Sequence, residues 1–265
     1  MFLHVADAIQ SGFRKVAVRT VDTDVIVLAV VLLDKLQTLT EEIIQLWVAF
    51  GTGGNLRYLA AHDIAGSFVN GAALALPAFH AFTRCDTVSC FHRKGKKTAL
   101  DTWKCFPEVT PVFIALSNPQ EEIEDDWMTL LERFVVLMYD RTSNSKDVND
   151  ARLQLFTRNS RKFDAIPPTQ DALLQHVKRT AYQAGHIWGQ ALKPSPIIQS
   201  PQHWGWVLDD GDWRPLWTTL PEITKSCQEL VKCTCEKGCQ GGCSCRKVNL
   251  HCTALCKCRD KCENR

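Results

Sequence analysis

The chain has 265 residues, of which 45% are hydrophobic and 23% are charged, and its formal net charge is +2. These values are ordinary for a globular protein and allow one sizeable core with appendages. The longest uninterrupted apolar run, Val25 to Leu33, has nine residues, whereas a helix that crosses a bilayer needs about 20. No signal peptide is visible at the N-terminus. We therefore expect an intracellular protein without a membrane partner, whose thiols stay reduced.

Positive charge is concentrated in two stretches of the chain. From Lys225 to the C-terminus, nine Lys and Arg residues oppose four Asp and Glu residues. From Arg84 to Lys104, six basic residues oppose two acidic ones. Both stretches could face a polyanion, and we expect nucleic acid as the partner of at least one of them.

The first part of the chain has the pattern of an α/β domain. Apolar positions at helical spacing predict a helix that ends near Gly12, and the segments KVAVRT and QLWVAF read as short buried strands. Between them, VIVLAVVLLDKL could be a helix or a second strand. We favour a helix because Asp24 can cap it and because a crossover helix suits an α/β unit. Further helical segments are expected from about His62 to Phe82.

This α/β pattern predicts an incomplete core. Three parallel strands are too few to be covered well on both faces, and no capping residue precedes the first helix. We therefore expect that the front half of the domain is absent from the chain. A second copy, or a partner that supplies the missing half, could complete it.

Two longer helices and an irregular segment follow. An amphipathic pattern from Glu121 to Tyr139 begins with acidic residues, which are favoured in a first helical turn. Thr169 is placed to cap another helix that runs to about Trp188. From Lys193 to Pro221 the chain is rich in Pro and Trp. These tryptophans could stack on bases, but we expect them mainly to anchor an irregular segment to the core.

The strongest chemical signal is a block of nine cysteines, which are Cys233, Cys235, Cys239, Cys243, Cys245, Cys252, Cys256, Cys258 and Cys262. Cysteine pairs separated by short polar spacers cannot build an apolar core, so the block needs a crosslink. Disulfides are the alternative to metal, but nine is an odd number and C-x-C partners are poorly spaced to bridge each other.

Zinc on thiolates accounts for the block better than disulfides do. Zinc is redox-silent and takes four ligands in tetrahedral structural sites. Three ions would need twelve ligand positions, so nine thiolates suffice for three ions only if three thiolates each bridge two ions.

The cysteine block resembles the tesmin-type CXC domain. The resemblance is carried by Cys233-x-Cys235, Cys239, Cys243-x-Cys245-Arg246-Lys247, Cys252-Thr253-x-Leu255-Cys256-x-Cys258 and Cys262-x-Asn264. It implies a trinuclear zinc cluster, with three Zn²⁺ ions on nine thiolates, and sequence-selective DNA binding as in several relatives. This chain carries one such unit, whereas plant and animal relatives carry two. It also lacks the tyrosine-bearing second pattern through which those relatives contact DNA.

Nucleic acid, and DNA in particular, is therefore the expected partner of the cysteine block. The candidate phosphate contacts are Lys232, Lys237, Arg246, Lys247 and Lys257. A zinc-stapled tail that contacts another protein is the alternative.

Two carboxylates stand one residue apart in TVDTDV, which runs from Thr20 to Val25. If the preceding strand extends through this segment, Asp22 and Asp24 point to the same side. They would then lie at the carboxyl end of a strand, where α/β sheets place their sites. The two aspartates could hold a divalent metal, and the alternative is a turn with a helix cap.

A third carboxylate, Asp86, follows an apolar helix and precedes a turn that contains Gly95. Gly95 permits close backbone approach, and Lys96 and Lys97 lie where a helix N-terminus can bind phosphate. Carboxylates that hold metal ions beside a phosphate-binding hairpin suit a metal-dependent phosphodiesterase.

The acidic residues and the hairpin resemble the flap-endonuclease branch of the PIN-like nucleases. The matching positions are Asp22 and Asp24 for an Asp-x-Asp pair, Asp86 for a later Asp, and Gly95, Lys97 and Ala99 for the hairpin. Nearly the whole chain is similar to uncharacterised transposon-associated animal proteins that join such a core to a terminal CXC domain. The stretch AYQAGHIWGQAL carries part of this similarity.

The chain departs from the nuclease family at several positions. The family has glycine where this chain has Arg84 and Arg93, and it places further acids before the point at which this chain begins. Two Mg²⁺ or Mn²⁺ ions about 4 Å apart need several carboxylates. The three aspartates would therefore hold at most one ion.

The sequence thus predicts an α/β protein in three segments. Residues 1–140 form the C-terminal half of a PIN-like, parallel-sheet core with a helical hairpin, residues 141–226 a helical, Trp- and Pro-rich middle, and residues 227–265 the CXC zinc domain. We expect a nuclear, zinc-dependent nucleic-acid-binding protein derived from a transposon-type nuclease, without full activity. The alternatives are an active divalent-metal-dependent flap-type nuclease and a protein-interaction scaffold with a zinc-stapled tail.

Overall fold

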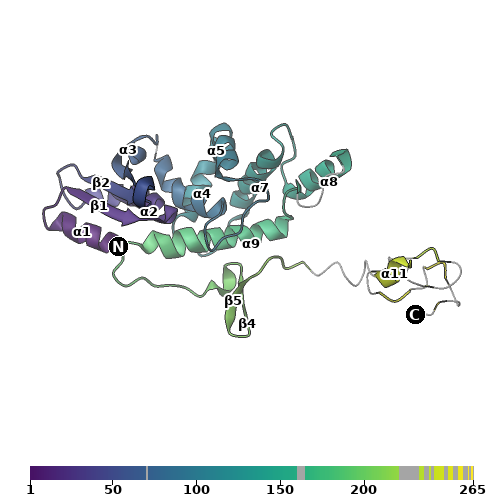
Figure 1. Cartoon of the computed structure of the whole chain (residues 1–265). Coiled ribbons are helices and arrows are strands. Elements are labelled where there is room, and N and C mark those ends of the chain that lie inside the picture. The colour runs from purple at the N-terminus through teal and green to yellow at the C-terminus, as the bar shows by residue number, and fades with distance from the viewer. Residues whose placement is uncertain are drawn as a thin grey trace. The chain divides into compact units, whose positions relative to one another are not determined.

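The computed structural model describes residues 1–69, 71–159 and 165–220, and in the C-terminal region residues 233–235, 239, 242–247, 250–252, 256–258, 262 and 264. The chain divides into two compact units, Met1–Thr218 (unit 1) and Thr219–Arg265 (unit 2) (Figure 1). Unit 1 is mixed α/β with small sheets, and unit 2 is rich in cysteine.

The N-terminal part of unit 1 contains a three-stranded sheet in the order β1 (Lys15–Thr20), β2 (Gln45–Phe50), β3 (Arg57–Ala60). The parallel β1–β2 pair confirms the two strands expected from KVAVRT and QLWVAF. The expectation of an all-parallel sheet is wrong, because β3 runs antiparallel to β2. The connection between β2 and β3 is a short loop, and a loop of that length can join only antiparallel neighbours.

Helix α2 (Thr23–Gln37) joins the two parallel strands, as expected for VIVLAVVLLDKL. Its N-cap is Asp22 and not Asp24, because the Asp22 side chain accepts a hydrogen bond from the Asp24 backbone N–H at 2.8 Å. α1 (Phe2–Gln10) and α3 (Ala61–Gly66) pack beside α2 and the sheet. Their shared hydrophobic cluster includes Phe2, Val5, Ile9, Val18, Ala29, Leu32, Leu36, Leu46, Val48 and Ala61.

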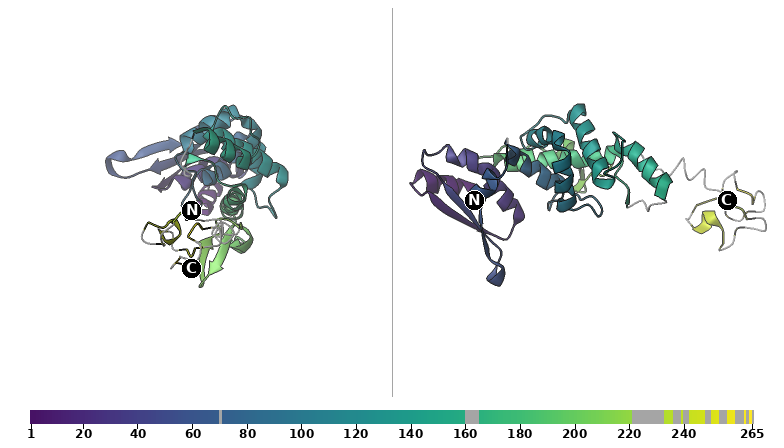
Figure 2. Two further views of the ribbon diagram at one scale, coloured as in Figure 1. Left: turned by 90° about the vertical axis from the view of Figure 1, so that its right-hand side faces the viewer. Right: turned by 90° about the horizontal axis from the view of Figure 1, so that it is seen from above.

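The rest of unit 1 is mainly helical and lies beside the sheet (Figures 1 and 2). Its α-helices are α4 (Leu76–Phe82), α5 (Lys96–Cys105), α6 (Thr110–Leu116), α7 (Asp125–Tyr139), α8 (Val148–Asn159) and α9 (Gln170–Ala181). A short hairpin of β4 (Trp206–Asp209) and β5 (Asp212–Pro215) follows. No helix in the described part of the chain is both long enough and apolar enough to cross a membrane.

One hydrophobic cluster runs through these helices from Ala75 to Trp204. The segment boundary expected at residue 140 falls inside this cluster, since α8 packs on α7 and α9 packs on both α4 and α7. The helix expected from Glu121 begins at Asp125, with Glu124 as its N-cap. The first two predicted segments therefore share one core.

Helix α9 carries polar side chains into the interior of unit 1. Thr169 caps it as predicted, accepting a hydrogen bond from the Ala172 N–H at 3.3 Å. Its buried polar residues are Gln175, His176, Arg179 and Thr180. Since buried polar groups are almost always hydrogen-bonded, these residues determine which backbone segments can lie against α9.

The tryptophans of the irregular segment fall into two groups. Trp188 and Trp204 are 8% and 4% exposed and belong to the hydrophobic cluster, which confirms the expected anchoring role for these two. Trp213 and Trp217 are 41% and 59% exposed. Their indole rings are therefore accessible at the surface of unit 1.

Gly185 lies in a π-helical turn, Tyr182–Ile187, that continues α9. A Cβ atom at Gly185 would lie 2.3 Å from the Asn118 carbonyl oxygen and 3.1 Å from the Leu116 carbonyl oxygen. Gly189 faces the Ser117 carbonyl oxygen, with a Cβ distance of 3.3 Å. The two glycines of AYQAGHIWGQAL therefore allow the chain to cross the end of α6 at backbone contact.

We expect Gly185→Ala to lower the free energy of unfolding by about 2 to 3 kcal/mol, because the added methyl group meets backbone atoms that cannot rotate away. Urea unfolding followed by circular dichroism measures the change. Gly66→Ala is the matched control, since a Cβ at that helical position meets nothing within 4 Å. Equal stability of the two variants would contradict the close crossing.

His176 predicts a loss of stability in acid. Burial lowers its pKa from 6.5 to about 4, so the unfolded chain takes up this proton before the folded chain does. Its contribution is fully present above pH 6.5 and is lost as the pH falls toward 4. We expect the wild-type protein to lose about 2 to 3 kcal/mol more than His176→Gln between pH 7 and about pH 4.5.

Urea unfolding at the two pH values tests this prediction. Glutamine does not titrate and can replace both hydrogen bonds of the neutral ring, while the other buried histidines remain in both proteins. A parallel decline of both proteins would show that the His176 ring does not carry the effect.

Candidate metal centre

The candidate metal centre in unit 2 is built from thiols. Seven of the nine predicted ligands are buried, and Cys235 and Cys262 are half-buried. Three sets of four Sγ atoms each lie within 4.8 Å of one another. These sets are Cys233, Cys239, Cys243 and Cys252; Cys233, Cys252, Cys256 and Cys258; and Cys239, Cys252, Cys258 and Cys262.

The sulfur–sulfur distances fit metal coordination better than disulfide bonding. The Cys239 and Cys262 Sγ atoms lie 3.5 Å apart, and the Cys233 and Cys252 Sγ atoms 3.9 Å apart. A tetrahedron with Zn–S bonds of about 2.3 Å has edges of about 3.8 Å, whereas a disulfide joins sulfurs about 2.05 Å apart. The described cysteines are all free thiols. The cluster can therefore hold metal ions.

The three sets of thiols overlap. Cys252 belongs to all three, whereas Cys233, Cys239 and Cys258 each belong to two. Cys245 lies next to the sets, with its Sγ atom 3.6 Å from that of Cys256. Sharing of thiolates between ions, which the ligand arithmetic requires for three ions, is compatible with this overlap.

Hydrogen bonds from outside the sulfur cluster hold it in place. Asn264 donates from its backbone N–H to the Cys262 Sγ at 3.3 Å and from Nδ2 to the Cys252 Sγ at 3.5 Å. Its carbonyl oxygen accepts from the Cys252 N–H at 2.6 Å. Asn264 was predicted only as part of the cysteine motif, without a role of its own. Its place two residues after the last cysteine was the available signal, since metal ligands commonly have such supporting partners.

Hydrogen bonds and removal from water shift the pKa values of the thiols. The Arg246 backbone N–H lowers the pKa of the Cys243 thiol to about 6. Removal from water raises the pKa of the Cys258 thiol to about 12. Metal binding to this cluster must displace protons from such thiols, so loading is coupled to pH.

The basic residues predicted to contact phosphate in this unit differ in their roles. Arg246 donates from its guanidinium to the Cys239 carbonyl oxygen at 3.1 Å, so it also supports the cluster. Lys247 and Lys257 are exposed. Lys232 and Lys237 lie outside the described residues.

The structure does not gather the three aspartates of unit 1 into a metal site. Asp22 uses its side chain to cap α2, since β1 ends at Thr20 and the chain does not stay extended to Asp24. Asp86 is exposed. Among the described residues, every set of three or more close metal-ligating side chains consists of cysteines. The strand therefore does not continue to Asp24, and Asp22 takes the helix-cap role that the sequence offered as the alternative.

Asp24 instead forms a polar network with His80 and Lys96. The His80 Nε2–H donates to Asp24 Oδ1 at 2.8 Å, so His80 is a buried, hydrogen-bonded histidine. Burial, together with the charge of Lys96, lowers the pKa of His80 despite this carboxylate. The ring is therefore neutral near pH 7.

Lys96 is turned toward the protein instead of presenting a free ammonium. Its Nζ donates to the His80 carbonyl at 2.9 Å, the Thr83 hydroxyl at 3.2 Å and the Arg84 carbonyl at 2.6 Å. Loss of hydration lowers the pKa of Lys96 to about 8. Lys96 therefore donates to acceptors at the end of α4. Its hydrogen bonds serve this contact within the protein and not the phosphate contact that was predicted.

The remaining hairpin residues lie at the start of α5, as predicted. Gly95 is its N-cap, and Lys97 is exposed. Gly95 has a φ of −85°, and a Cβ there would meet nothing within 4 Å. The fold itself therefore does not require glycine at this position.

Two arginines of the hairpin have unusual backbone conformations. Arg84 has a φ of 106° and Arg93 a φ of 55°, a region that favours glycine. The backbone geometry at both turns is thus the one expected for glycine.

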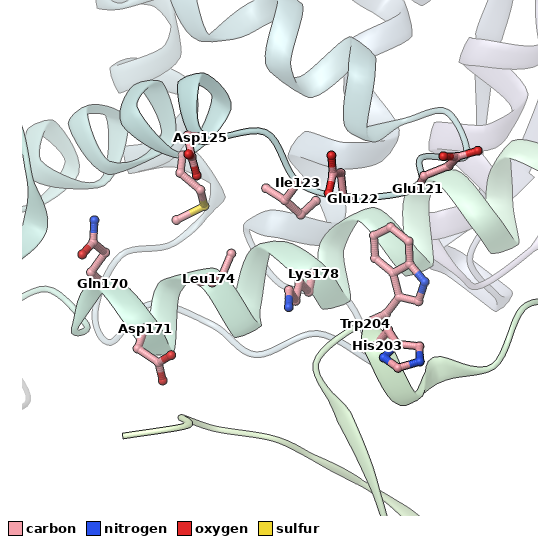
Figure 3. A pocket seen from close by; sticks show the side chains of 11 residues that line it. Glu121, Glu122, Ile123, Asp125, Gln170, Asp171, Leu174, Lys178, His203 and Trp204 are labelled. Atoms are coloured by element: carbon pink, nitrogen blue, oxygen red, sulfur yellow. The ribbon is translucent and has the colours of Figure 1, made fainter. Parts of the chain in front are cut away.

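A pocket of unit 1, of about 540 Å³, lies beside α9 and contains none of the predicted site residues (Figure 3). Four carboxylates line it, from Glu121, Glu122, Asp125 and Asp171, against the single ammonium of Lys178. Such a lining repels phosphate.

Comparisons with protein-family models, with curated proteins and with solved structures gave no match to this chain.

The strained turn at Arg84 yields a stability prediction. We expect Arg84→Gly to raise the free energy of unfolding by about 0.5 to 1 kcal/mol, because glycine adopts positive φ without the cost of about 1 to 2 kcal/mol that a Cβ imposes. Thermal unfolding measures the change. Arg84→Ala is the control, since it removes the side chain but keeps the Cβ, and it should give no gain. A gain in both variants would assign the effect to the guanidinium.

Proposed function

We propose that this chain is a zinc-stabilised, nucleic-acid-binding nuclear protein, derived from a transposon-type PIN-like nuclease and without a complete two-metal centre. The observation that carries the proposal is the packing of buried thiols at sulfur–sulfur distances of 3.5 to 3.9 Å. The resemblance to the tesmin-type CXC domain adds the expectation of DNA as the ligand.

Zinc is the metal that suits the thiol cluster best. Thiolate ligands at tetrahedral spacing select zinc among the common structural metals, and such sites contribute their binding energy to folding. Three ions on nine thiolates, with shared ligands such as Cys252, is the loading that we propose. Without the metal, seven buried cysteines would leave unit 2 with no crosslink.

Phosphate binding is assigned to exposed basic residues of each unit. Lys247 and Lys257 lie on unit 2 with exposed side chains, while Lys97 and Arg84 lie exposed on unit 1. Contacts of this kind bind the phosphate backbone and give little sequence information by themselves. We therefore propose binding with weak sequence selectivity.

The positions of the acidic residues support loss of nuclease activity. A two-metal phosphodiesterase needs several carboxylates directed at the same ions. Asp22 is used as a helix cap and Asp24 as the acceptor of the His80 N–H. Neither is directed with exposed Asp86 at a common ion.

The experiment is fluorescence anisotropy with labelled duplex DNA over a range of salt concentrations, using zinc-loaded full-length protein. We expect about three zinc ions per chain by mass spectrometry. Binding should weaken steeply with salt and be abolished by a zinc chelator, because folding of unit 2 depends on the metal. Metal-free protein that binds equally well would contradict the proposal.

Two variants localise the phosphate contacts. Lys247→Gln with Lys257→Gln should lower the slope of log affinity against log salt by about 1.8, at about 0.9 for each lost duplex contact. Lys193→Gln, an exposed lysine of unit 1, is the matched control and should leave the slope unchanged. A salt-independent or undetectable interaction would favour the protein-scaffold alternative.

The same protein is tested for cleavage of single-stranded, duplex and flapped DNA with Mg²⁺ or Mn²⁺. We expect binding without cleavage, alike in the wild-type protein and in a variant with Asp24→Asn and Asp86→Asn. Cleavage that disappears in this variant would establish the active-nuclease alternative.

A further inference from the structure

A second pocket in unit 1, of about 280 Å³, carries no acidic residue among the described residues that line it. Its polar lining consists mainly of Ser89, Tyr139, Arg152, His176 and Arg179, and Trp217 lies at its edge. Two of these residues are fixed cations and none is an anion at neutral pH. The pocket thus has the opposite charge from the larger pocket beside it on α9.

The spacing of residues along α9 produces the cationic face of this pocket. Ala172, His176 and Arg179 are separated by four and three residues, which places them on one side of the helix. Ala172 lies near the helix N-terminus, where the positive end of the helix dipole favours negative charge. Arg152 is contributed by α8 on the other side of the pocket.

Arg179 is a buried cation without a carboxylate partner. It is 2% exposed, and no acidic side chain of the described residues lies within ion-pair distance of it. One guanidinium nitrogen donates to the Gly205 and Leu216 carbonyls at 3.0 and 2.7 Å, and the other donates to Ser89 Oγ at 3.4 Å. Its charge is therefore held by carbonyl and hydroxyl dipoles and by the Trp217 ring, and a buried charge without a counterion is costly.

The remaining donors of the pocket converge on the same space. The Arg152 guanidinium is held by the Pro167 carbonyl through one nitrogen, which leaves its other N–H groups available among the described contacts. His176 donates from Nε2 to the Phe82 carbonyl at 2.9 Å. Its Nδ1 is then an acceptor, so the Ser89 hydroxyl donates to it at 2.7 Å. This tautomer leaves the ring neutral and keeps the net charge of the pocket at two.

The charge and shape of the lining select the ligand. A phosphate monoester carries a charge of about −1.5 to −2 at pH 7 and presents several acceptor oxygens. It therefore matches a site with two guanidinium groups better than a ligand with a single carboxylate would. The Trp217 ring lies 5.3 Å from the Arg179 guanidinium carbon and is 59% exposed. An exposed indole beside a phosphate site can stack on a base.

We propose that this pocket binds a phosphate monoester, with the phosphoryl group between Arg152 and Arg179 and the organic group against Trp217. The source of the monoester is either a free mononucleotide or the 5′-phosphorylated end of a nucleic-acid strand. The site lies wholly in unit 1, so the inference does not rest on the zinc cluster or on the proposed duplex binding.

Isothermal titration of the full-length protein with four probes tests the site. Inorganic phosphate and deoxyadenosine 5′-monophosphate should bind, the nucleotide more tightly, whereas deoxyadenosine should not. A 5′-phosphorylated oligonucleotide is compared with its 5′-hydroxyl form. Preference for the phosphorylated strand identifies a strand end as the source, and equal binding of the two strands with retained mononucleotide binding identifies a free nucleotide.

Matched variants keep the test independent of folding. Arg152→Gln should weaken nucleotide binding at least about ten-fold, because one charge-assisted fork is lost. Arg141→Gln, an exposed arginine outside the pocket, is its control and should bind as the wild type does. Trp217→Ala should weaken binding of the nucleotide but not that of inorganic phosphate.

Ala172 supplies a variant that preserves the helix. Ala172→Glu places a carboxylate at the third position after the Thr169 cap, where glutamate favours the helix start. It should abolish phosphate binding, while Ala172→Gln, of equal size, should retain it. Absence of nucleotide binding to the wild type, or equal binding by the two Ala172 variants, would overturn the proposal, whatever the outcome with duplex DNA.

Discussion

The structure of unit 1 depends on the polar groups that α9 buries. His176 and Arg179 point into the interior, and each must find acceptors there because an unpaired buried donor or cation is costly. The acceptors are backbone carbonyls from distant segments: Phe82 at the end of α4, and Gly205 and Leu216 in the irregular Trp-rich chain. One helix face therefore fixes the hairpin region and the C-terminal part of unit 1 in place. The same requirement leaves Arg179 without a carboxylate and makes the adjacent pocket cationic.

Unit 2 differs from unit 1 in what its buried cluster contains. The buried cluster in the described part of unit 2 consists of cysteine side chains, with Leu250 packed against them. Free thiols at tetrahedral spacing stabilise the fold little, since burial opposes their ionisation. A bound cation would reverse this balance, because it stabilises thiolates and links segments that have no other crosslink. Hydrogen bonds from Asn264 and Arg246 then orient the ligands. We therefore assign the folding of unit 2 to metal and that of unit 1 to its hydrophobic clusters.

The sequence predicted the structure best where a residue pattern is compatible with only one local structure. The strands KVAVRT and QLWVAF, the helix between them and the Thr169 cap were predicted, because hydrophobic periodicity and capping chemistry act locally. The cysteine cluster was predicted because so many thiols at short spacing leave few alternatives. For the aspartate pair, a metal site and a helix cap both remained open, since the sequence is compatible with a strand that ends at Thr20 and with one that continues to Asp24. The antiparallel β3 and the two pockets were also missed, because they arise from contacts between segments far apart in the chain.

The turns at Arg84 and Arg93 show that the backbone conformation of the hairpin and the roles of its side chains can vary independently. An arginine at a φ of 106° is strained by its Cβ, so its surroundings must hold it there. Lys96 does so by donating to the carbonyls of His80 and Arg84 and to the Thr83 hydroxyl. Glycine would adopt the conformation without strain. Lys96 and Asp24 both serve hydrogen bonds within the protein, so contacts within unit 1 hold the backbone path of the hairpin.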